Sequence, residues 1–187
     1  MIKTMKFSIV IKLCIIAILV SKTTILFGQD TNNQKKEINL TDFKALDISG
    51  LAQVYIKQGT KNKVDMKVSG VAIKKIKVFV DNETLFIDTP RSISGESIKI
   101  TVTYKKIVDI KVKDAAELTA LNTIKGDVLK ITVTQASSTA ISVDLKHLEI
   151  SMKNNADLKI KGITDNQRVK STSSGGTFDN SGLTIRD

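Results

Sequence analysis

Apolar and polar residues alternate with a period of two along most of the chain after residue 43. Between Ile98 and Tyr104 every second residue is apolar, while Lys99, Thr101 and Thr103 lie between them. The same alternation recurs in residues 64–68, 129–133, 141–145, 148–152 and 158–161. Because successive side chains of a strand point to opposite faces, this pattern predicts half-buried β-strands. No convincing amphipathic helical period occurs in this region, so we predict an all-β fold.

Five short segments resemble one another and define a second, longer period. Each has two small or turn-forming residues, then a polar residue and then an apolar or small one, although the first segment fits least clearly. The segments are residues 51–54, 115–118, 137–140, 155–158 and 175–178. The last residues of the final four segments are spaced by 22, 18 and 20 positions.

A period of about 20 residues, with short strands joined by small-residue turns, predicts a β-solenoid. Stacked coils would bury a shared stripe of Ile, Val and Leu, and small residues would allow tight turns between neighbouring coils. The drift of the period leaves one alternative open, an antiparallel sandwich of hairpins with coincidental spacing.

Residues 1–29 have the layout of a cleavable secretory signal peptide. Three lysines precede or interrupt the apolar positions, residues 13–20 are an unbroken apolar run, and a more polar stretch ends at Gly28 and Gln29. This layout predicts cleavage near Gly28 or Gln29. The apolar run is well short of the roughly 20 residues that a membrane-spanning helix needs, and an uncleaved anchor is the alternative. We expect residues 30–40 to form a flexible polar leader and residues 41–187 to form the folded domain.

Removal of the signal peptide changes the composition. The formal net charge falls from +10 to +6, since 25 basic and 19 acidic residues remain. The only cysteine, Cys14, is also removed, which leaves no disulfide, no thiol nucleophile and no thiolate metal ligand. Cys14 lies inside the apolar run and not beside the cleavage point, so we expect no lipid anchor. The remaining chain has no Trp and few other aromatic residues, which favours a core of stacked aliphatic side chains.

Candidate catalytic and metal-binding groups are sparse. His147 is the only histidine, and a site with one histidine and no cysteine would need several carboxylates to hold a metal. We interpret it as a turn or surface residue. No nucleophile elbow surrounds the serines, which we interpret as solvated turn residues of the repeats. These serines are Ser137, Ser138, Ser171, Ser173 and Ser174.

Acidic residues need separate treatment because some β-helix proteins cleave polysaccharides with acidic groups and calcium. Asp114, Glu117 and Asp157 are expected to align at turns of successive coils, where they would offer at most a weak cation site. The other acids are spread over the coils; they are Asp109, Asp127, Asp144 and Glu149. We interpret all of them as solvated carboxylates, and we predict no catalytic, cofactor-binding or metal-binding residue and no cofactor.

Several lysines are predicted to point outward from the strands, so that one face could carry a row of positive charge. They are Lys99, Lys111, Lys113, Lys130, Lys153, Lys159 and Lys161. Such a face would attract an anionic glycan, a lipid headgroup or a nucleic acid. We favour an ordinary solvated surface. Nucleic acid is disfavoured because the chain carries an export signal, because arginines are few, and because no aromatic residues interleave with the lysines.

Residues 43–59 (FKALDISGLAQVYIKQG) resemble the opening of the bacterial "putative auto-transporter adhesin" family, also called the head GIN domain family. That opening has an aromatic residue, a strand, Ser-Gly, and a second strand ending in Gln-Gly. The later segments follow in the family order over roughly Thr41 to Asp187; they are residues 64–70, 76–78, 85–87, 98–103 and then the repeats. The resemblance implies a right-handed parallel β-helix-like solenoid, preceded by a few N-terminal β-strands and exported to the envelope of Bacteroidetes-type bacteria.

Two departures from the family pattern matter. Family turns usually contain Ser-Gly and Gly-Asp pairs, whereas residues 114–117 read DAAE and residues 154–157 read NNAD. Family members also usually run on for further coils, while this sequence stops at Asp187. An uncapped last coil would leave an open edge that invites pairing with another chain.

These observations favour a non-enzymatic, exported β-solenoid that acts as an adhesin-like binding module of the cell envelope. The alternatives are a periplasmic structural or accessory protein without an adhesive role and, more remotely, a carbohydrate-active enzyme. The expected location is the periplasm, the outer-membrane surface or the medium. The expected partner is a surface ligand such as a glycan or a protein, with membrane contact only through the export signal and with self-association possible through the open edge.

Overall fold

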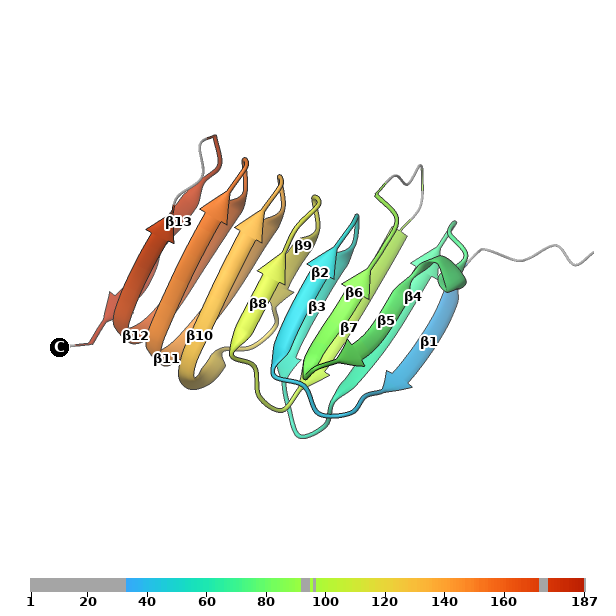
Figure 1. Ribbon diagram of the computed structural model, residues 1–187, viewed down its shortest axis with the longest axis horizontal. Helices are drawn as coiled ribbons and strands as arrows, with labels where there is room; N and C mark the ends of the chain where they lie inside the picture. Colours follow the sequence, from blue (N-terminus) through green and yellow to red (C-terminus); the bar gives the residue numbers. More distant parts are fainter. Residues whose placement is uncertain (1–32, 92–94, 96, 172–174, 187) are drawn as a thin grey trace, which may run out of the picture. The chain divides into compact units, whose positions relative to one another are not determined.

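The computed structural model describes residues 33–91, 95, 97–171 and 175–186, and this part of the chain is almost entirely β-structure. Thirteen strands pair in one sheet, and the single helical element of the described residues is a 3-10 turn, Ile73–Lys75 (Figure 1). The all-β prediction is therefore confirmed. None of the described helical segments is long and apolar enough to cross a membrane. The predicted signal peptide, residues 1–29, lies outside the described residues.

The strands differ in length from four to 16 residues. In chain order they are β1 (Gln34–Asn39), β2 (Ala45–Ser49), β3 (Gln53–Gln58), β4 (Lys63–Ser69), β5 (Lys77–Asp81), β6 (Thr84–Asp88), β7 (Ser97–Tyr104), β8 (Asp109–Val112), β9 (Glu117–Ala120), β10 (Ile124–Thr134), β11 (Ser138–Lys153), β12 (Asp157–Ser171) and β13 (Phe178–Ile185).

Eleven strands follow one another in a curled path, β1-β4-β7-β3-β9-β11-β10-β8-β2-β6-β5, and β12 and β13 extend it from β11. The path brings a first layer, β1, β4, β7, β3 and β9, against a second layer, β8, β2, β6 and β5 (Figure 1). The long strand β11 contributes to both layers, since its first residues pair with β9 and its last residues pair with β10 next to β8.

The sheet is mixed. The β1–β4, β4–β7 and β5–β6 pairs are antiparallel, and every other strand pair of the described residues is parallel. The repeated part of the chain is thus paired in parallel, and the alternative of antiparallel hairpins is wrong for it. Parallel partners lie close to one predicted period apart, since Leu148 pairs with Leu129 and Phe178 pairs with Leu158.

The small-residue segments predicted as turns lie next to one another in the structure. Glu117 donates its backbone N–H to the carbonyl of Ala52, Ser138 to that of Ala116 and Asp157 to that of Ser137, at 2.9, 3.0 and 2.9 Å. Ala116, Ser137 and Ala156 are buried, because each is covered by the equivalent residue of the neighbouring segment. A bulky side chain at any of these positions would have no room.

Ser137 differs from its sequence interpretation as a solvated residue. It is fully buried, and its hydroxyl donates to the carbonyl oxygens of Thr134 at 2.7 Å or Val112 at 3.0 Å. A buried hydroxyl needs such a partner because leaving it unpaired would cost about 1–3 kcal/mol. The serine therefore closes the turn after β10 from inside.

The core fills the space between the two layers with aliphatic side chains. Leu46 and Ile48 of β2 and Val54 and Ile56 of β3 are all at most 1% exposed. Among the described aromatic residues only Phe43 and Tyr104 are buried with them. The expected core of stacked Ile, Val and Leu is the one observed, and the other rings are left for the surface or its margin.

The expected flexible leader differs from the structure at Gln34–Asn39, which forms strand β1. This segment pairs antiparallel with β4 over six residues. Its sequence lacks a clear apolar alternation, yet Ile38 packs against the core and Glu37 forms an ion pair with Lys63 at 3.0 Å. The strand forms because the edge of β4 offers a complete row of backbone hydrogen-bonding groups, which local sequence does not reveal.

Candidate functional site

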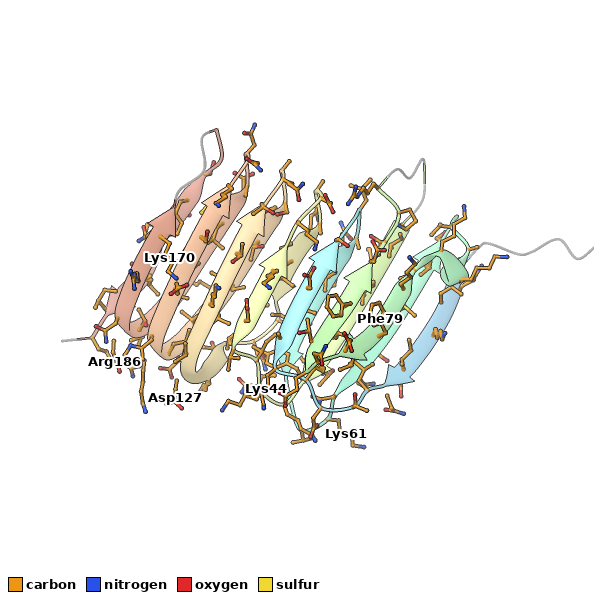
Figure 2. All side chains as sticks on the ribbon, in the orientation of Figure 1. Lys44, Lys61, Phe79, Asp127, Lys170 and Arg186 are labelled. Carbon is orange, nitrogen blue, oxygen red and sulfur yellow. The ribbon has the colours of Figure 1, made fainter. Side chains whose placement is uncertain are left out.

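A pair of stacked phenylalanines, one exposed and one half-buried, lies on the outer surface of the second layer. Phe79 of β5 and Phe86 of β6 are direct cross-strand partners, with ring centroids 5.1 Å apart and an interplanar angle of 16°. Phe79 is 48% exposed, and it is marked in Figure 2. The neighbouring residues of these strands, Val78 and Leu85, face the core. Strand alternation therefore forces both rings outward, where they form a flat apolar surface.

Charged and hydroxyl groups surround the ring pair. Asp47 of β2 is the partner of Phe86 in the parallel β2–β6 ladder, and its carboxylate lies 2.9 Å from Lys113 Nζ. On the other side, the Asp88 carboxylate accepts a hydrogen bond from Ser49 Oγ at 3.1 Å and lies 3.8 Å from Lys77 Nζ. The negative charges of two acids and the positive charges of two lysines thus cancel around the rings.

Together these groups form a shallow pocket of about 260 Å³, which we call the phenylalanine pocket. It is lined by Asp47, Ser49, Lys77, Phe79, Phe86, Ile87, Asp88 and Lys113. Sites that enclose drug-sized ligands occupy about 300–1,000 Å³, so this pocket suits contact with one ring-sized part of a larger ligand. Its chemistry fits a neutral molecule that has both an apolar face and several hydroxyl groups.

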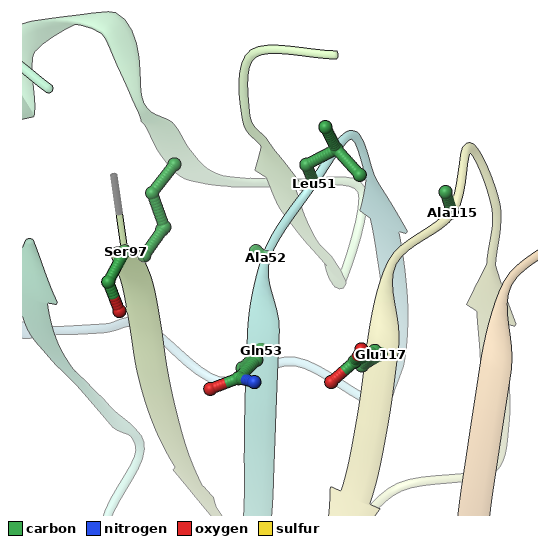
Figure 3. A pocket seen from close by; sticks show the side chains of 7 residues that line it. Leu51, Ala52, Gln53, Ser97, Ala115 and Glu117 are labelled. Carbon is green, nitrogen blue, oxygen red and sulfur yellow. The ribbon is translucent and has the colours of Figure 1, made fainter. Parts of the chain in front are cut away.

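A second pocket lies at the turn end of the first layer, between β7, β3 and β9, and has a volume of about 200 Å³. Figure 3 shows Gln53 and Glu117 on neighbouring strands at its lower end, with Leu51, Ala52, Ser97 and Ala115 above them. It offers one amide and one carboxylate beside a small apolar surface. Such a set can hydrogen-bond a ligand but lacks the paired acids that glycosidases use.

The structure separates the acids that the sequence placed at successive turns. Asp114 lies 3.0 Å from Arg91. Glu117 and Asp157 are held apart in the sheet by Ser138, which pairs with both. In the ranges that the structure describes, no group of three or more His, Cys, Asp or Glu side chains is close enough to hold a metal ion.

The remaining predicted acids are also distributed over separate elements. Asp109 begins β8, where it lies between Ala45 and Lys130 in the ladders, and Asp144 of β11 contacts Arg186 at 3.2 Å. Lys146 donates a hydrogen bond to Asp127 and holds its pKa below the ordinary value. Lys170 does the same for the pKa of Glu149. Figure 2 shows Asp127, Lys170 and Arg186 at separate places.

His147 is exposed on β11, and its Nδ1 lies 3.4 Å from the Asn166 side-chain nitrogen. Ser138 is exposed in the same strand. The predictions for Ser173 and Ser174 fall outside the described residues, as does the side chain of Ser171. The structure thus brings no histidine–serine–acid set together among the residues that it describes.

The lysines predicted to share one face are divided between the two layers. Lys111, Lys130 and Lys153 belong to the ladders of the second layer, and Lys113 directly follows β8 there. Lys99, Lys159 and Lys161 belong to the ladders of the first layer. Lys113 is half-buried through its contact with Asp47. The curl of the sheet separates residues that look equivalent in the linear alternation.

Sequence reasoning missed the phenylalanine pocket. The available signal was the alternation in KVFVD and TLFID, where an aromatic residue occupies the polar face of each of two neighbouring strands. The contribution of Asp47 and Lys113 had no such signal, since Asp47 of β2 and Lys113, directly after β8, lie far from Phe79 and Phe86 in the chain.

The family model described as "Putative auto-transporter adhesin, head GIN domain" matches residues 42–187. A comparison with the curated proteins finds no significant match.

Several solved structures share the fold at low sequence identity. A "putative adhesin" from Bacteroides fragilis NCTC 9343 superposes with a TM-score of 0.74 at 19% identity, covering 82% of this chain and 73% of that chain. A "putative adhesin" from Parabacteroides distasonis ATCC 8503 gives 0.69 at 15% identity, covering 83% and 65%. A "putative lipid binding protein" from the same organism gives 0.54 at 13% identity, covering 76% and 72%. At these identities the likeness shows the fold alone.

Proposed function

The chain belongs to the "putative auto-transporter adhesin, head GIN domain" family, and from this premise we propose that it is a non-enzymatic, exported binding module that holds neutral glycans at the phenylalanine pocket. The observation that carries the proposal is the exposed Phe79–Phe86 stack with its charge-balanced polar rim. Sugar rings have an apolar C–H face and an equatorial belt of hydroxyl groups, which are the two features that this pocket complements.

The polar groups around the two rings suit ligand binding and not catalysis. Asp47 and Asp88 each contact a lysine, and Ser49 donates to Asp88, so the carboxylate oxygens are held in place to accept hydrogen bonds from ligand hydroxyl groups. Glycosidases instead need two carboxyl groups on either side of the scissile bond, one of them protonated. The family and the structural neighbours carry adhesin or binding descriptions, which agrees with a module that does not catalyse a reaction.

We further propose that the repeats form a right-handed parallel β-helix-like solenoid with coils of about 20 residues. The support comes from the stacked turn residues and from the parallel ladders, whose partners lie close to one predicted period apart in β10, β11, β12 and β13. A solenoid of this kind presents flat, rigid faces, which suits contact with an extended polymer.

Export is proposed from the signal-like layout of residues 1–29 and from the adhesin description of the family. Protease treatment of intact cells, followed by immunoblotting against lysed controls, tests where the protein resides. Loss of the band from intact cells would support a surface binding role. Protection until the outer membrane is broken would favour the periplasmic structural or accessory role instead.

The binding proposal is tested with immobilised mannan, dextran and galactan as neutral glycan probes. We expect the purified protein to bind at least one of them, and Phe79→Ala to weaken that binding about tenfold or more, since a lost ring contact of roughly 1.4 kcal/mol corresponds to that factor. Val128→Ala, which truncates another exposed apolar side chain on β10, is the matched control and should bind normally. Equal binding by Phe79→Ala and the unaltered protein, or no binding to any probe, would refute the proposal.

A further inference from the structure

Three lysines form a row across the first layer. Lys35 of β1 is the cross-strand partner of Lys67 of β4, and Lys67 is the partner of Lys99 of β7. All three are exposed, and neighbouring strands lie about 4.8 Å apart. The lysine row therefore presents three lysine side chains from evenly spaced backbone positions. It lines a shallow pocket of about 480 Å³ together with Ser69 and Ser97 among other residues.

The positive charge of this row is not balanced by ion pairs within the described part of the chain. The same face carries Glu37 and Asp65, two residues along β1 and β4 from the row, and both contact Lys63 at 3.0 Å. Hydrogen bonds from Lys63 to Glu37 and then Asp65 raise the pKa of Lys63, so these acids already have a partner. None of the three row lysines forms an ion pair with another described residue. Like charges directly opposite each other in a sheet are destabilising.

We propose that the lysine row is a binding site for an acidic polysaccharide, with successive carboxylates of the polymer lying against Lys35, Lys67 and Lys99. A linear polyuronate carries one carboxylate on each sugar residue, so a chain lying across the strands can bring several carboxylates to the three lysines. The hydroxyls of Ser69 and Ser97 are available beside them for sugar hydroxyl groups. This site is independent of the phenylalanine pocket, which is formed by the other layer.

The residues that follow the lysine row on the next strands limit the number of negative charges that a ligand can place there. Gln53 of β3 follows Lys99 in the ladder, and Glu117 of β9 follows Gln53. Gln53 can hydrogen-bond a neutral group, while Glu117 repels a fourth carboxylate. The site is thus matched to three successive charges, and removal of the Glu117 charge should allow a longer polyanion to bind more tightly.

Other polyanions fit the row less well. A membrane surface is engaged by basic residues together with apolar side chains that enter the lipid boundary. The large exposed apolar residues of the described chain lie on β5, β10, β12, β13 and the segment between β9 and β10, and none lies on β1, β4 or β7. The row also lacks arginine, the residue that makes paired contacts to phosphate.

The test measures binding of the purified protein to oligogalacturonate at low ionic strength. We expect binding that weakens with added salt. Replacing Lys35, Lys67 and Lys99 together by Gln should weaken it about tenfold or more, given the free energy of exposed ion pairs. The matched control replaces Lys57, Lys111 and Lys161 by Gln; these are exposed lysines on β3, β8 and β12, and their replacement removes the same total charge. The control should retain nearly full affinity, and Glu117→Gln should bind longer chains more tightly.

Thermal unfolding accompanies the binding assay. The row variant should unfold at the same or a higher temperature, because removing like-charge neighbours does not weaken the sheet. Equal loss of binding in the row variant and the control would mean nonspecific electrostatic attraction and would overturn the proposal. Binding of inorganic tripolyphosphate or of anionic phosphatidylserine vesicles as tight as that of oligogalacturonate would also overturn it. The absence of oligogalacturonate binding would overturn it as well. Each of these outcomes leaves the neutral-glycan assay at Phe79 unaffected.

Discussion

Gly50 illustrates how a single residue fixes the chain beside the phenylalanine pocket. It follows Ser49 at the end of β2 with φ at +92°, a conformation that other residues adopt only with strain. A Cβ atom at this position would lie 1.9 Å from the carbonyl oxygen of Thr89. Thr89 in turn donates its backbone N–H to Ser49 at 3.0 Å. The turn therefore requires glycine for two separate reasons, backbone conformation and close approach.

The expected result of Gly50→Ala is a loss of roughly 2 kcal/mol or more in the free energy of unfolding, because strain and a backbone clash act together. Gly126→Ala is the control. Its Cβ would meet nothing closer than a Leu145 methyl at 3.8 Å, and its φ lies outside the left-handed region. That substitution should be neutral or slightly stabilising. Urea denaturation measures the free energy of unfolding of both variants. Similar values for the two would show that the turn does not require glycine at position 50.

The sequence predicted well which strand residues are buried, but it did not predict which side chains contact each other. The alternation correctly placed Ile98, Ile100, Val102 and Tyr104 inside, because strand geometry alone decides which face a residue occupies. The contact of Asp47 with Lys113 depends on which distant strands become neighbours. The buried hydroxyl of Ser137 also depends on tertiary packing, since a serine in a turn is more often solvated.

At the scale of elements, β13 is held to β12 partly by one carboxylate. Asp179 accepts hydrogen bonds from the Ser181 hydroxyl at 2.7 Å and backbone N–H at 3.1 Å, and its other oxygen lies 3.1 Å from Lys159 Nζ. These contacts lower the pKa of Asp179 to about 2, from an ordinary 3.8. They also lie at the register shift between Lys159 and Lys161, where the β12–β13 ladder is irregular.

Because the folded pKa lies below the unfolded one, the Asp179 contribution to stability is present above about pH 4 and is lost as the pH falls towards about 2. We expect Asp179→Asn to be less stable than the unaltered protein at pH 6, and the gap to close as the pH falls to 2. Chemical denaturation at a series of pH values measures this gap. A gap that stays constant over the whole range would show that the carboxylate charge does not support β13.

The strands of the repeats could be predicted from sequence better than the N-terminal strands. Residues 129–133 and 148–152 show clean alternation and lie within β10 and β11. β1 lacks such a pattern and forms because β4 offers a free edge. KVFVD and TLFID do carry a local apolar alternation, but their antiparallel pairing, which brings Phe79 onto Phe86, is a property of the tertiary fold.

At the scale of the folded domain, the sequence predicted an all-β chain with a long repeat period, and the parallel ladders connect residues at nearly that separation. The way the N-terminal strands join the repeats had no sequence signal. β2 and β3 pair in parallel with β8 and β9, which come much later in the chain. This joining sets the two layers against each other, and it places the phenylalanine pocket on one layer and the lysine row on the other.

An NMR titration can locate a neutral glycan at the phenylalanine pocket. Isotope-labelled protein is titrated with oligosaccharides of mannan, dextran or galactan, and backbone amide shifts are mapped on the structure. We expect saturable shifts confined to β5, β6, the end of β2 and the neighbourhood of Lys113, with those of Phe79 and Phe86 among the largest. Shifts centred on the first layer or on the β12–β13 edge, or no saturable shifts with any of the three oligosaccharides, would show that the phenylalanine pocket is not a glycan site.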